Sequence, residues 1–147
     1  MTFDVVIERV LGATQEVLRG LNGLLPQLSS SAIVITQHRL SEIVSDESVL
    51  LFVCRLNGTI VGSITLVVFS IPTGVRALIE DVIVDESVRG KQIGEKLVLH
   101  ALNAAREKGS LTVDLTSRPQ REAANKLYVK VGFQLRDTNV YRYILNK

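Results

Sequence analysis

The spacing of apolar residues along the chain predicts an alternation of strands and helices. Apolar positions recur every three or four residues over 14–28 and over 93–108, which is the period of an amphipathic helix. Shorter apolar stretches are typical of strands, and they lie over 3–9, 49–56, 59–69 and 76–85. Asn57-Gly58 separates the second and third of these and favours a two-residue hairpin turn.

Weaker signals fill the gaps between these elements. We expect a loop over 29–36, a short second helix over 37–44, and a loop over 71–75 because that stretch contains a proline and a glycine. Leu111–Thr116 is predicted to be a strand. Ser117-x-x-Gln120 has the spacing of a capping box, so a further helix should begin there and end at Val131, before Gly132.

Two final strands are predicted at Phe133–Leu135 and Asn139–Leu145. The order of elements is therefore β-α-α-β-β-β-α-β-α-β-β, without repeats, low-complexity tracts or linkers. This order indicates a mixed α/β domain built on one sheet.

Length and composition narrow the class of protein. A chain of 147 residues is about one domain, so we expect a single domain over 1–147. The chain is 46% apolar and 22% charged, which is ordinary for a globular protein, and a net charge of +2 gives no argument for nucleic-acid or membrane binding. Cys54 is the only cysteine, so neither a disulfide framework nor a thiolate metal site is expected, and His38 and His100 lack metal-ligand partners at useful spacing.

The N-terminal residues Met1 to Asp4 lack a basic region followed by a long apolar one, so we expect no signal peptide. No apolar run approaches the roughly 20 residues of a membrane span. A cytoplasmic protein is the prediction.

The segment 84–94 has the properties of an anion site. An apolar strand runs into the basic, glycine-bearing turn Arg89-Gly90-Lys91-Gln92, and the turn opens onto a helix. Backbone N–H groups and a helix N-terminus in this arrangement hold pyrophosphate groups. The dinucleotide pattern G-x-G-x-x-G and the P-loop pattern are both absent, so neither of those cofactors is indicated.

Arg89-x-x-Gln92-x-Gly94 instead resembles the acetyl-CoA loop of the GNAT N-acetyltransferase superfamily, [Gln/Arg]-x-x-Gly-x-[Gly/Ala]. The segment 124–133 is similar to its second signature, A-x-x-L-Y-x-x-x-G-F, about 35 residues further on. The resemblance implies a central mixed, mostly antiparallel sheet with splayed fourth and fifth strands, flanked by about four helices. It also implies acetyl-CoA as co-substrate and no metal.

The resemblance assigns acetyl-CoA to the backbone before the loop, to the loop itself and to one helical side chain. The cofactor-binding residues are Val82, Ile83, Val84, Arg89, Gly90, Lys91, Gln92, Ile93, Gly94 and Asn125. The loop departs from the family pattern at Gln92, where the family has a glycine. We expect Gln92 to donate its backbone N–H to the anion if its φ angle stays negative, with CoA affinity retained or altered.

Two side chains are the catalytic candidates. Glu80 lies in an otherwise apolar strand and resembles an acidic position that some GNAT enzymes use as a base; Asp114, or water alone, is the alternative. Asp81 should face the opposite side of the sheet, because successive side chains of a strand alternate. Tyr128 matches the tyrosine of the second signature, which implies a hydrogen bond to the departing thiolate and its protonation. A core tyrosine at a helix end is the other interpretation of Tyr128.

These observations predict an N-acetyltransferase that moves an acetyl group to a primary amine by direct attack in a ternary complex. A non-catalytic acetyl-CoA-binding module or sensor, and a transferase for another acyl group or a protein N-terminus, are the alternatives. The acceptor, a small molecule or a protein amine, is not identified. Asp46 and Glu47 are the only acidic pair near the expected pocket, which argues against a polycation. A homodimer is possible by the resemblance, but no interface is evident from the sequence.

Overall fold

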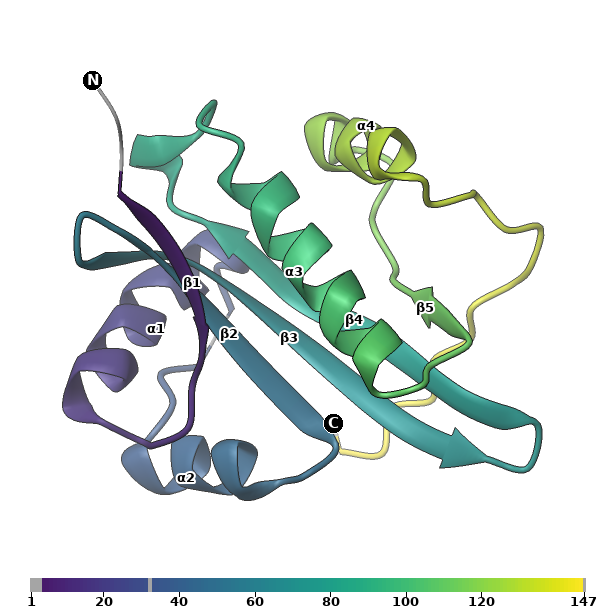
Figure 1. The fold of residues 1–147 in the computed structure, drawn as a ribbon, viewed down its shortest axis with the longest axis horizontal. Helices are drawn as coiled ribbons and strands as arrows, with labels where there is room; N and C mark the ends of the chain where they lie inside the picture. Colours follow the sequence, from purple (N-terminus) through teal and green to yellow (C-terminus); the bar gives the residue numbers. More distant parts are fainter. Residues whose placement is uncertain (1–3, 32, 147) are drawn as a thin grey trace. The chain divides into compact units, whose positions relative to one another are not determined.

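The computed structural model describes residues 4–31 and 33–146, which form two compact units, residues 1–116 and 117–147 (Figure 1). The first unit holds all five strands and three of the helices. Its elements in chain order are β1 (Val5–Arg9), α1 (Gln15–Leu28), α2 (Gln37–Ser45), β2 (Val49–Leu56), β3 (Thr59–Ile71), β4 (Gly74–Val84), the 3₁₀ turn η1 (Glu86–Val88), α3 (Ile93–Glu107) and β5 (Thr112–Asp114). The second unit contains α4 (Glu122–Val131).

The strands form one sheet in the order β1-β2-β3-β4-β5, antiparallel throughout except for the parallel pair β4–β5. This confirms the predicted mixed α/β class. The predicted hairpin turn is also confirmed, since Asn57 and Gly58 both have positive φ angles, 51° and 87°. The β4–β5 pairing is short: it joins Arg76 to Thr112 and ends at Leu78 and Asp114. Beyond Leu78, β4 continues to Val84 without a β5 partner, which is the predicted splay.

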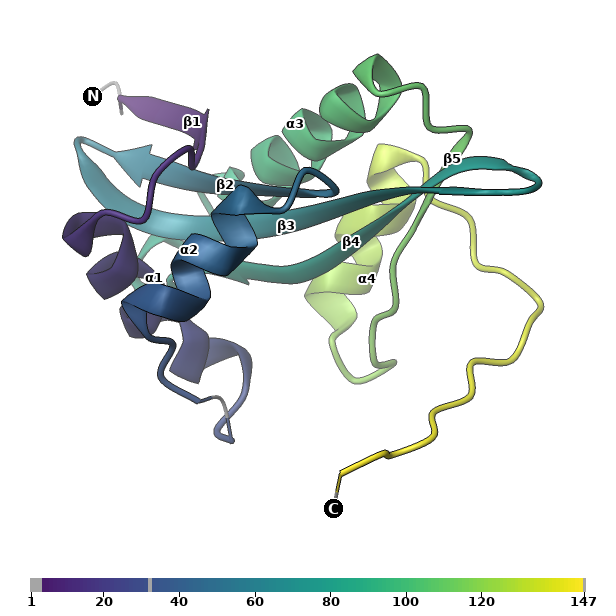
Figure 2. The same ribbon diagram turned by 90° about the horizontal axis from the view of Figure 1, so that it is seen from below.

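Helices cover both faces of the sheet in the first unit, with α3 on one side and α1 and α2 on the other (Figure 2). On the α3 side, the ring of Phe52 meets His100 of α3 edge-on at 4.9 Å. A side chain at Gly62 would come within 3.3 Å of both Leu97 and Ile93, so this glycine is needed for α3 to lie close to β3. On the other side, a buried cluster joins the sheet to α1 and α2 and comprises Val10, Val17, Leu21, Leu40, Leu51 and Val53.

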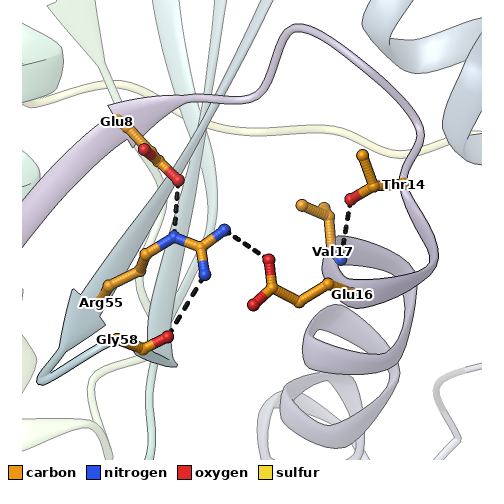
Figure 3. Close-up of polar contacts among 6 residues, drawn as sticks. All are labelled: Glu8, Thr14, Glu16, Val17, Arg55 and Gly58. Carbon is orange, nitrogen blue, oxygen red and sulfur yellow. Dashed lines mark hydrogen bonds and ion pairs between the residues drawn. The ribbon is translucent and has the colours of Figure 1, made fainter.

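Arg55 ties three segments of the first unit together (Figure 3). Its guanidinium donates to Glu8 of β1 at 2.6 Å, to Glu16 of α1 at 2.9 Å and to the carbonyl of Gly58 in the hairpin turn at 3.3 Å. The two carboxylates raise the pKa of Arg55, and Arg55 lowers the pKa of the Glu16 carboxyl. This fork fixes the edge strand and the first helix to the hairpin.

Helix boundaries in the first unit lie close to those predicted. Thr14 and Thr36 cap α1 and α2 by accepting backbone N–H bonds from Val17 and Arg39 at 3.2 and 3.1 Å. The hairpin between β3 and β4 is tighter than predicted, because the strands extend to Ile71 and from Gly74. The predicted start of the first strand at Phe3 lies outside the described residues, as does one residue of the loop over 29–36.

In the last third of the chain, one predicted strand is confirmed with shorter bounds and three other predictions are wrong. The strand predicted over Leu111–Thr116 is Thr112–Asp114, since the pairing with β4 stops there. The capping box at Ser117 does not form: α4 begins at Glu122, and its N-cap, Arg121, makes no side-chain cap. Neither Phe133–Leu135 nor Asn139–Leu145 is a strand, because neither pairs with another strand within the described residues.

Candidate acyl-CoA site

A β-bulge reshapes β4 just before the predicted anion loop. Opposite the single residue Ile64 of β3, β4 has two residues, Asp81 and Val82, and Asp81 has a positive φ of 51°. The bulge shifts the alternation of side chains, so Glu80 and Ile83 lie on the same face of the sheet. The prediction that Asp81 faces away from Glu80 assumed strict alternation, and this alternation is interrupted at Asp81.

Glu80 lies on the α1 and α2 face together with two hydroxyl residues. It is exposed and directly opposite Thr65, and Ser63, two positions away on β3, is buried and opposite Ile83. Asp114 lies on the same face, since it pairs with Leu78, two residues before Glu80. The structure thus brings the two candidate bases to neighbouring strands where the strands begin to separate.

The segment between β4 and α3 is held by its own polar groups. Asp85 accepts hydrogen bonds from the backbone N–H and the hydroxyl of Ser87, both at 3.0 Å, and these bonds lower the pKa of the Asp85 carboxyl. Gln27, at the end of α1, accepts a bond from the backbone N–H of Glu86 at 2.9 Å. The loop is therefore fixed to both β4 and α1 before it reaches Arg89.

Gln92 adopts the left-handed conformation, with φ 61° and ψ 22°. The negative φ on which the predicted contact of the Gln92 backbone N–H depended is therefore not observed. The chain must reverse direction between the extended Arg89 and the first residue of α3, and this turn requires the conformation that a glycine would adopt freely. Gln92 is exposed and forms no side-chain cap, so it takes the backbone conformation of the family glycine at a cost in strain.

The N-terminus of α3 is suited to an anion. No side chain caps it, and Gly90, with φ 88°, would meet no atom within 4 Å of an added Cβ, so open space lies beside the loop backbone. Arg89 is exposed and Lys91 half-buried, and they supply cations, whereas Glu95 in the first helical turn supplies the opposite charge. The side chain of Ile93 is 1% exposed and packs in the core, which leaves only its backbone N–H for a ligand.

The second signature forms the end of α4 in the other unit. The N–H of Phe133 donates to the carbonyl of Tyr128 at 2.9 Å, and that of Gly132 donates to Val129 at 3.1 Å. This is a Schellman motif, and the Tyr128 and Phe133 rings make its apolar contact edge-on at 5.8 Å. Much of the L-Y-x-x-x-G-F pattern is thus explained by helix termination. The hydroxyl of Tyr128 is not part of that explanation.

The Tyr128 side chain is half-buried, and burial raises the pKa of its phenol while the charge of Arg121 opposes this effect. The phenol therefore stays protonated at neutral pH and is a hydrogen-bond donor. Asn125, one turn earlier, donates both amide hydrogens to the carbonyls of Arg118 and Arg121, at 2.9 and 2.8 Å. Only its side-chain oxygen remains to contact a ligand.

Comparison with known proteins decides the family. The model of the acetyltransferase (GNAT) family matches residues 22–133, which is most of the chain. The chain belongs to the acetyltransferase (GNAT) family. A search of curated proteins finds no match.

Solved structures show the same fold. A soil metagenomic aminoglycoside acetyltransferase in complex with trehalose is 22% identical with a TM-score of 0.84, covering 97% of each chain. Glucosamine-6-phosphate N-acetyltransferase from Arabidopsis thaliana is 24% identical with a TM-score of 0.79, covering 97% of this chain and 99% of that one. Aminoglycoside N-acetyltransferase AAC(6')-Iy, solved with CoA, is 14% identical with a TM-score of 0.82, covering 99% and 98%.

The other side chains of this GNAT family member that could be reactive are a cysteine and two histidines, and each has a packing or surface contact that accounts for it. Cys54 is fully buried, and burial raises the pKa of its thiol, so it is a small core residue. His100 packs on Phe52, and His38 lies 3.8 Å from Glu42 on an exposed helix face. Within residues 4–31 and 33–146, no cluster of His, Cys, Asp or Glu could hold a metal ion, and no helix is long and apolar enough to cross a membrane.

Sequence reasoning missed the residues that hold the loop between β4 and α3 in place. Asp85-x-Ser87 is the spacing of an Asx turn and was a readable signal. Gln27 left no such signal, because its partner lies 59 residues away along the chain. The bulge at Asp81 was also unreadable, since an aspartate in a strand is equally expected on an exposed face.

Proposed function

We propose that this protein is an acetyl-CoA-dependent N-acetyltransferase that moves an acetyl group to a primary amine by direct attack in a ternary complex. The observation that carries the proposal is the loop from Arg89 to Gly94. There Gln92 keeps a left-handed backbone that a glutamine adopts only at a cost, and α3 begins without a side-chain cap. A strained residue beside an open helix N-terminus is best explained by a ligand that needs that backbone.

The donor fits the features of the first unit. The backbone N–H groups of 92–94 and the cations Arg89 and Lys91 would hold the pyrophosphate. Val82–Val84 lie on the part of β4 that β5 does not pair with, so their backbone would take the pantetheine amides, as the family resemblance implies. The CoA bound by a structural neighbour of the same fold supports this choice of donor.

The acceptor amine has to lose a proton before it attacks. An amine with a pKa of about 10.4 is neutral in only about one molecule in 2,500 at pH 7, a deficit of about 4.6 kcal/mol. Glu80 is our proposed base, since it is exposed on the strand that runs into the loop. Asp114 on the neighbouring strand is the alternative, and Thr65 and Ser63 provide hydroxyls on the same face for an intervening water.

The departing thiolate needs a proton or a hydrogen-bond donor. We assign this role to Tyr128, whose raised pKa keeps the phenol protonated. Since a CoA-like thiol has a pKa of about 8.5, full proton transfer from the phenol is uphill. Tyr128 would therefore act mainly by donating a hydrogen bond to the sulfur. Asn125, through its free oxygen, is proposed to contact CoA.

We further propose that the two units belong to one acetyltransferase domain, because the family model extends across both, from 22 to 133. The relatives named above act on an aminoglycoside or on an amino sugar phosphate, so the fold alone does not select an acceptor. Asp46 and Glu47 are the only acidic pair near the loops that we expect to line the acceptor pocket, which leads us to favour an acceptor that is not a polycation. The cytoplasmic location remains a prediction from the sequence.

Calorimetric titration with acetyl-CoA, followed by a thiol-release assay with a panel of small amines and peptides, tests this function. Gly94→Leu should abolish acetyl-CoA binding, because the new side chain would stand in the first turn of α3, where the pyrophosphate is proposed to approach the backbone. Gly12→Leu is the matched control, since its added side chain meets no atom within 4 Å at Cβ. Equal affinity in the two variants would refute the loop assignment. Binding without thiol release for any amine would identify a CoA-binding module instead.

A further inference from the structure

Arg76 of β4 carries a positive charge that no acidic side chain pairs with among the described residues. Its guanidinium donates a hydrogen bond from Nη2 to the hydroxyl of Thr73 at 3.0 Å. The Nε atom is buried, and within residues 4–31 and 33–146 it has no hydrogen-bond partner. A buried N–H without a partner is costly, so this guanidinium is suited to an anionic ligand.

Arg76 shares a face of the sheet with the two candidate bases. Arg76, Leu78 and Glu80 alternate along β4 before the bulge, so their side chains lie on the α1 and α2 face. Asp114 pairs with Leu78 and lies on this face too. Since a strand rises by about 3.3 Å per residue, Arg76 and Glu80 are about 13 Å apart along β4. The bond to Thr73 holds the guanidinium toward the hairpin end, so an anion bound there would lie at least as far from Glu80.

The surface between these charges is apolar and only partly covered. Val67 and Phe69 of β3 pair with Leu78 and Arg76, so they share the same face, and we call Val67, Phe69 and Leu78 the apolar strip. All three are half-buried, whereas Ala77 on the α3 face is buried. Figure 1 and Figure 2 show that α1 and α2 lie beside the other half of the sheet, and that the hairpin end of β3 and β4 extends beyond both helices.

The order of carboxylate, apolar strip and cation along this face selects a type of acceptor. An acceptor amine lies at Glu80 if that carboxylate is to take its proton. An apolar body would cover the strip and remove it from water. An anion at the far end would then pair with Arg76, whereas a second amine there would be repelled. The apolar strip and Arg76 therefore favour an acceptor with one amine and one anion.

We propose that the acceptor is an elongated primary amine with a carboxylate or a phosphate at its other end, and that Arg76 binds this anion. The inference rests on the proposed function, in which Glu80 is the base. Arg76 lies too far along β4 to touch the reacting atoms. It determines which amine binds and does not take part in the transfer of the acetyl group.

Titration of amines into the CoA-loaded protein tests the inference without turnover. Aminobutanoate, aminohexanoate and aminodecanoate carry the carboxylate progressively further from the amine, by roughly 1.2 Å per bond of extended chain, and the matching amino alcohols are neutral controls. Aminodecanoate should bind roughly ten- to a hundredfold more tightly than its alcohol, and the butanoate pair about equally. Aminodecyl phosphate distinguishes the two anions. An anion that brings no advantage, or an advantage that does not grow with chain length, would overturn the proposal.

Variants at Arg76 separate its charge from its packing. Arg76→Met keeps a long apolar side chain and should remove the advantage of aminodecanoate over its alcohol, whereas Arg76→Lys should retain part of it. Arg106→Met is the matched control, because it removes an exposed cation on α3, on the opposite face of the sheet. Urea unfolding checks that both methionine variants are folded. An advantage that survives in Arg76→Met would overturn the proposal.

The thiol-release assay keeps this inference distinct from the proposed reaction. The anion should lower KM for aminodecanoate relative to its alcohol and leave kcat within about twofold, because Arg76 does not touch the reacting atoms. Arg76→Met should raise KM for aminodecanoate alone. Binding that depends on Arg76 without thiol release would refute the reaction and leave the anion site. Thiol release with equal KM for the two amines would leave the reaction and overturn the anion site.

Discussion

Replacing Gln92 with glycine should stabilise the protein. An L-residue in the left-handed conformation costs roughly 1–2 kcal/mol, and Gln92 holds that conformation without a side-chain cap to offset it. Glycine adopts the conformation freely but loses roughly 0.5–1 kcal/mol because its unfolded chain is more flexible. The expected difference is about 0.5–1 kcal/mol in favour of Gln92→Gly, or about 1–4 °C in Tm for a chain of this size.

Gln92→Ala is the matched control for this experiment. It removes the exposed side chain but keeps Cβ, so its unfolding free energy should stay within about 0.5 kcal/mol of the parent protein. Urea unfolding of the three proteins measures the difference at Gln92, and calorimetry with acetyl-CoA shows whether the loop still binds. We expect Gln92→Gly to bind at least as tightly as the parent, because its backbone already favours the bound geometry. A glycine variant no more stable than the alanine variant would show that Gln92 is unstrained.

Three further results are expected. Tyr128→Phe should lower turnover by roughly ten- to a hundredfold and leave acetyl-CoA affinity within about twofold, because only the hydrogen bond to the leaving sulfur is lost. Glu80→Gln should remove the acidic limb of the pH–rate profile, and Asp114→Asn should leave that limb in place. Arg55→Met should lower the unfolding free energy, since its bonds to the two half-exposed carboxylates of Glu8 and Glu16 are lost. Because the bond from Arg55 lowers the pKa of Glu16, the ionised carboxylate stabilises the folded protein at pH values above its unfolded pKa. This stability is lost as the pH falls through the folded pKa, so the Arg55→Met variant should lose less stability on acidification than the parent protein.

Each of these results has a contrary outcome. Full turnover in Tyr128→Phe would leave Tyr128 only its place in the helix-ending motif. An unchanged profile in Glu80→Gln, with a loss of the limb in Asp114→Asn, would exchange the roles of the two carboxylates. If urea unfolding gives the same difference in unfolding free energy between the parent protein and Arg55→Met at pH 7 and at pH 3, Glu16 does not contribute to the pH dependence.

The elements with a clear period were predictable from the sequence, and those that depend on distant partners were not. The helical spacing of apolar residues that begins at Ile93 and the Asn57-Gly58 turn are local signals, and the structure confirms both. The strand at 139–145 is also a strong local signal, but a strand exists only where another strand pairs with it, and the single chain supplies none among the described residues.

The candidate site likewise contains features that could be predicted from the sequence and features that could not. The order of strand, basic turn and helix was readable, and so was the Tyr128 signature. The φ angle of Gln92 was not, because the requirement comes from the angle between β4 and α3, and glutamine itself favours a negative φ. The anchoring of Glu86 by Gln27 likewise depends on how α1 packs against the sheet, which no local pattern encodes.

The bulge at Asp81 marks the point where β4 can lose one residue and keep its pairing with β3. A substitution at Asp81 acts on one exposed side chain and on a φ angle that asparagine or glycine also adopts. Deletion of Asp81 or Val82 would remove the extra position and leave a regular ladder, with Glu80 still opposite Thr65 and Ile83 still opposite Ser63. Among homologues, a one-residue gap in the alignment is therefore expected at this position, whereas a one-residue gap elsewhere in the paired part of β4 would turn the side chains that follow to the opposite face.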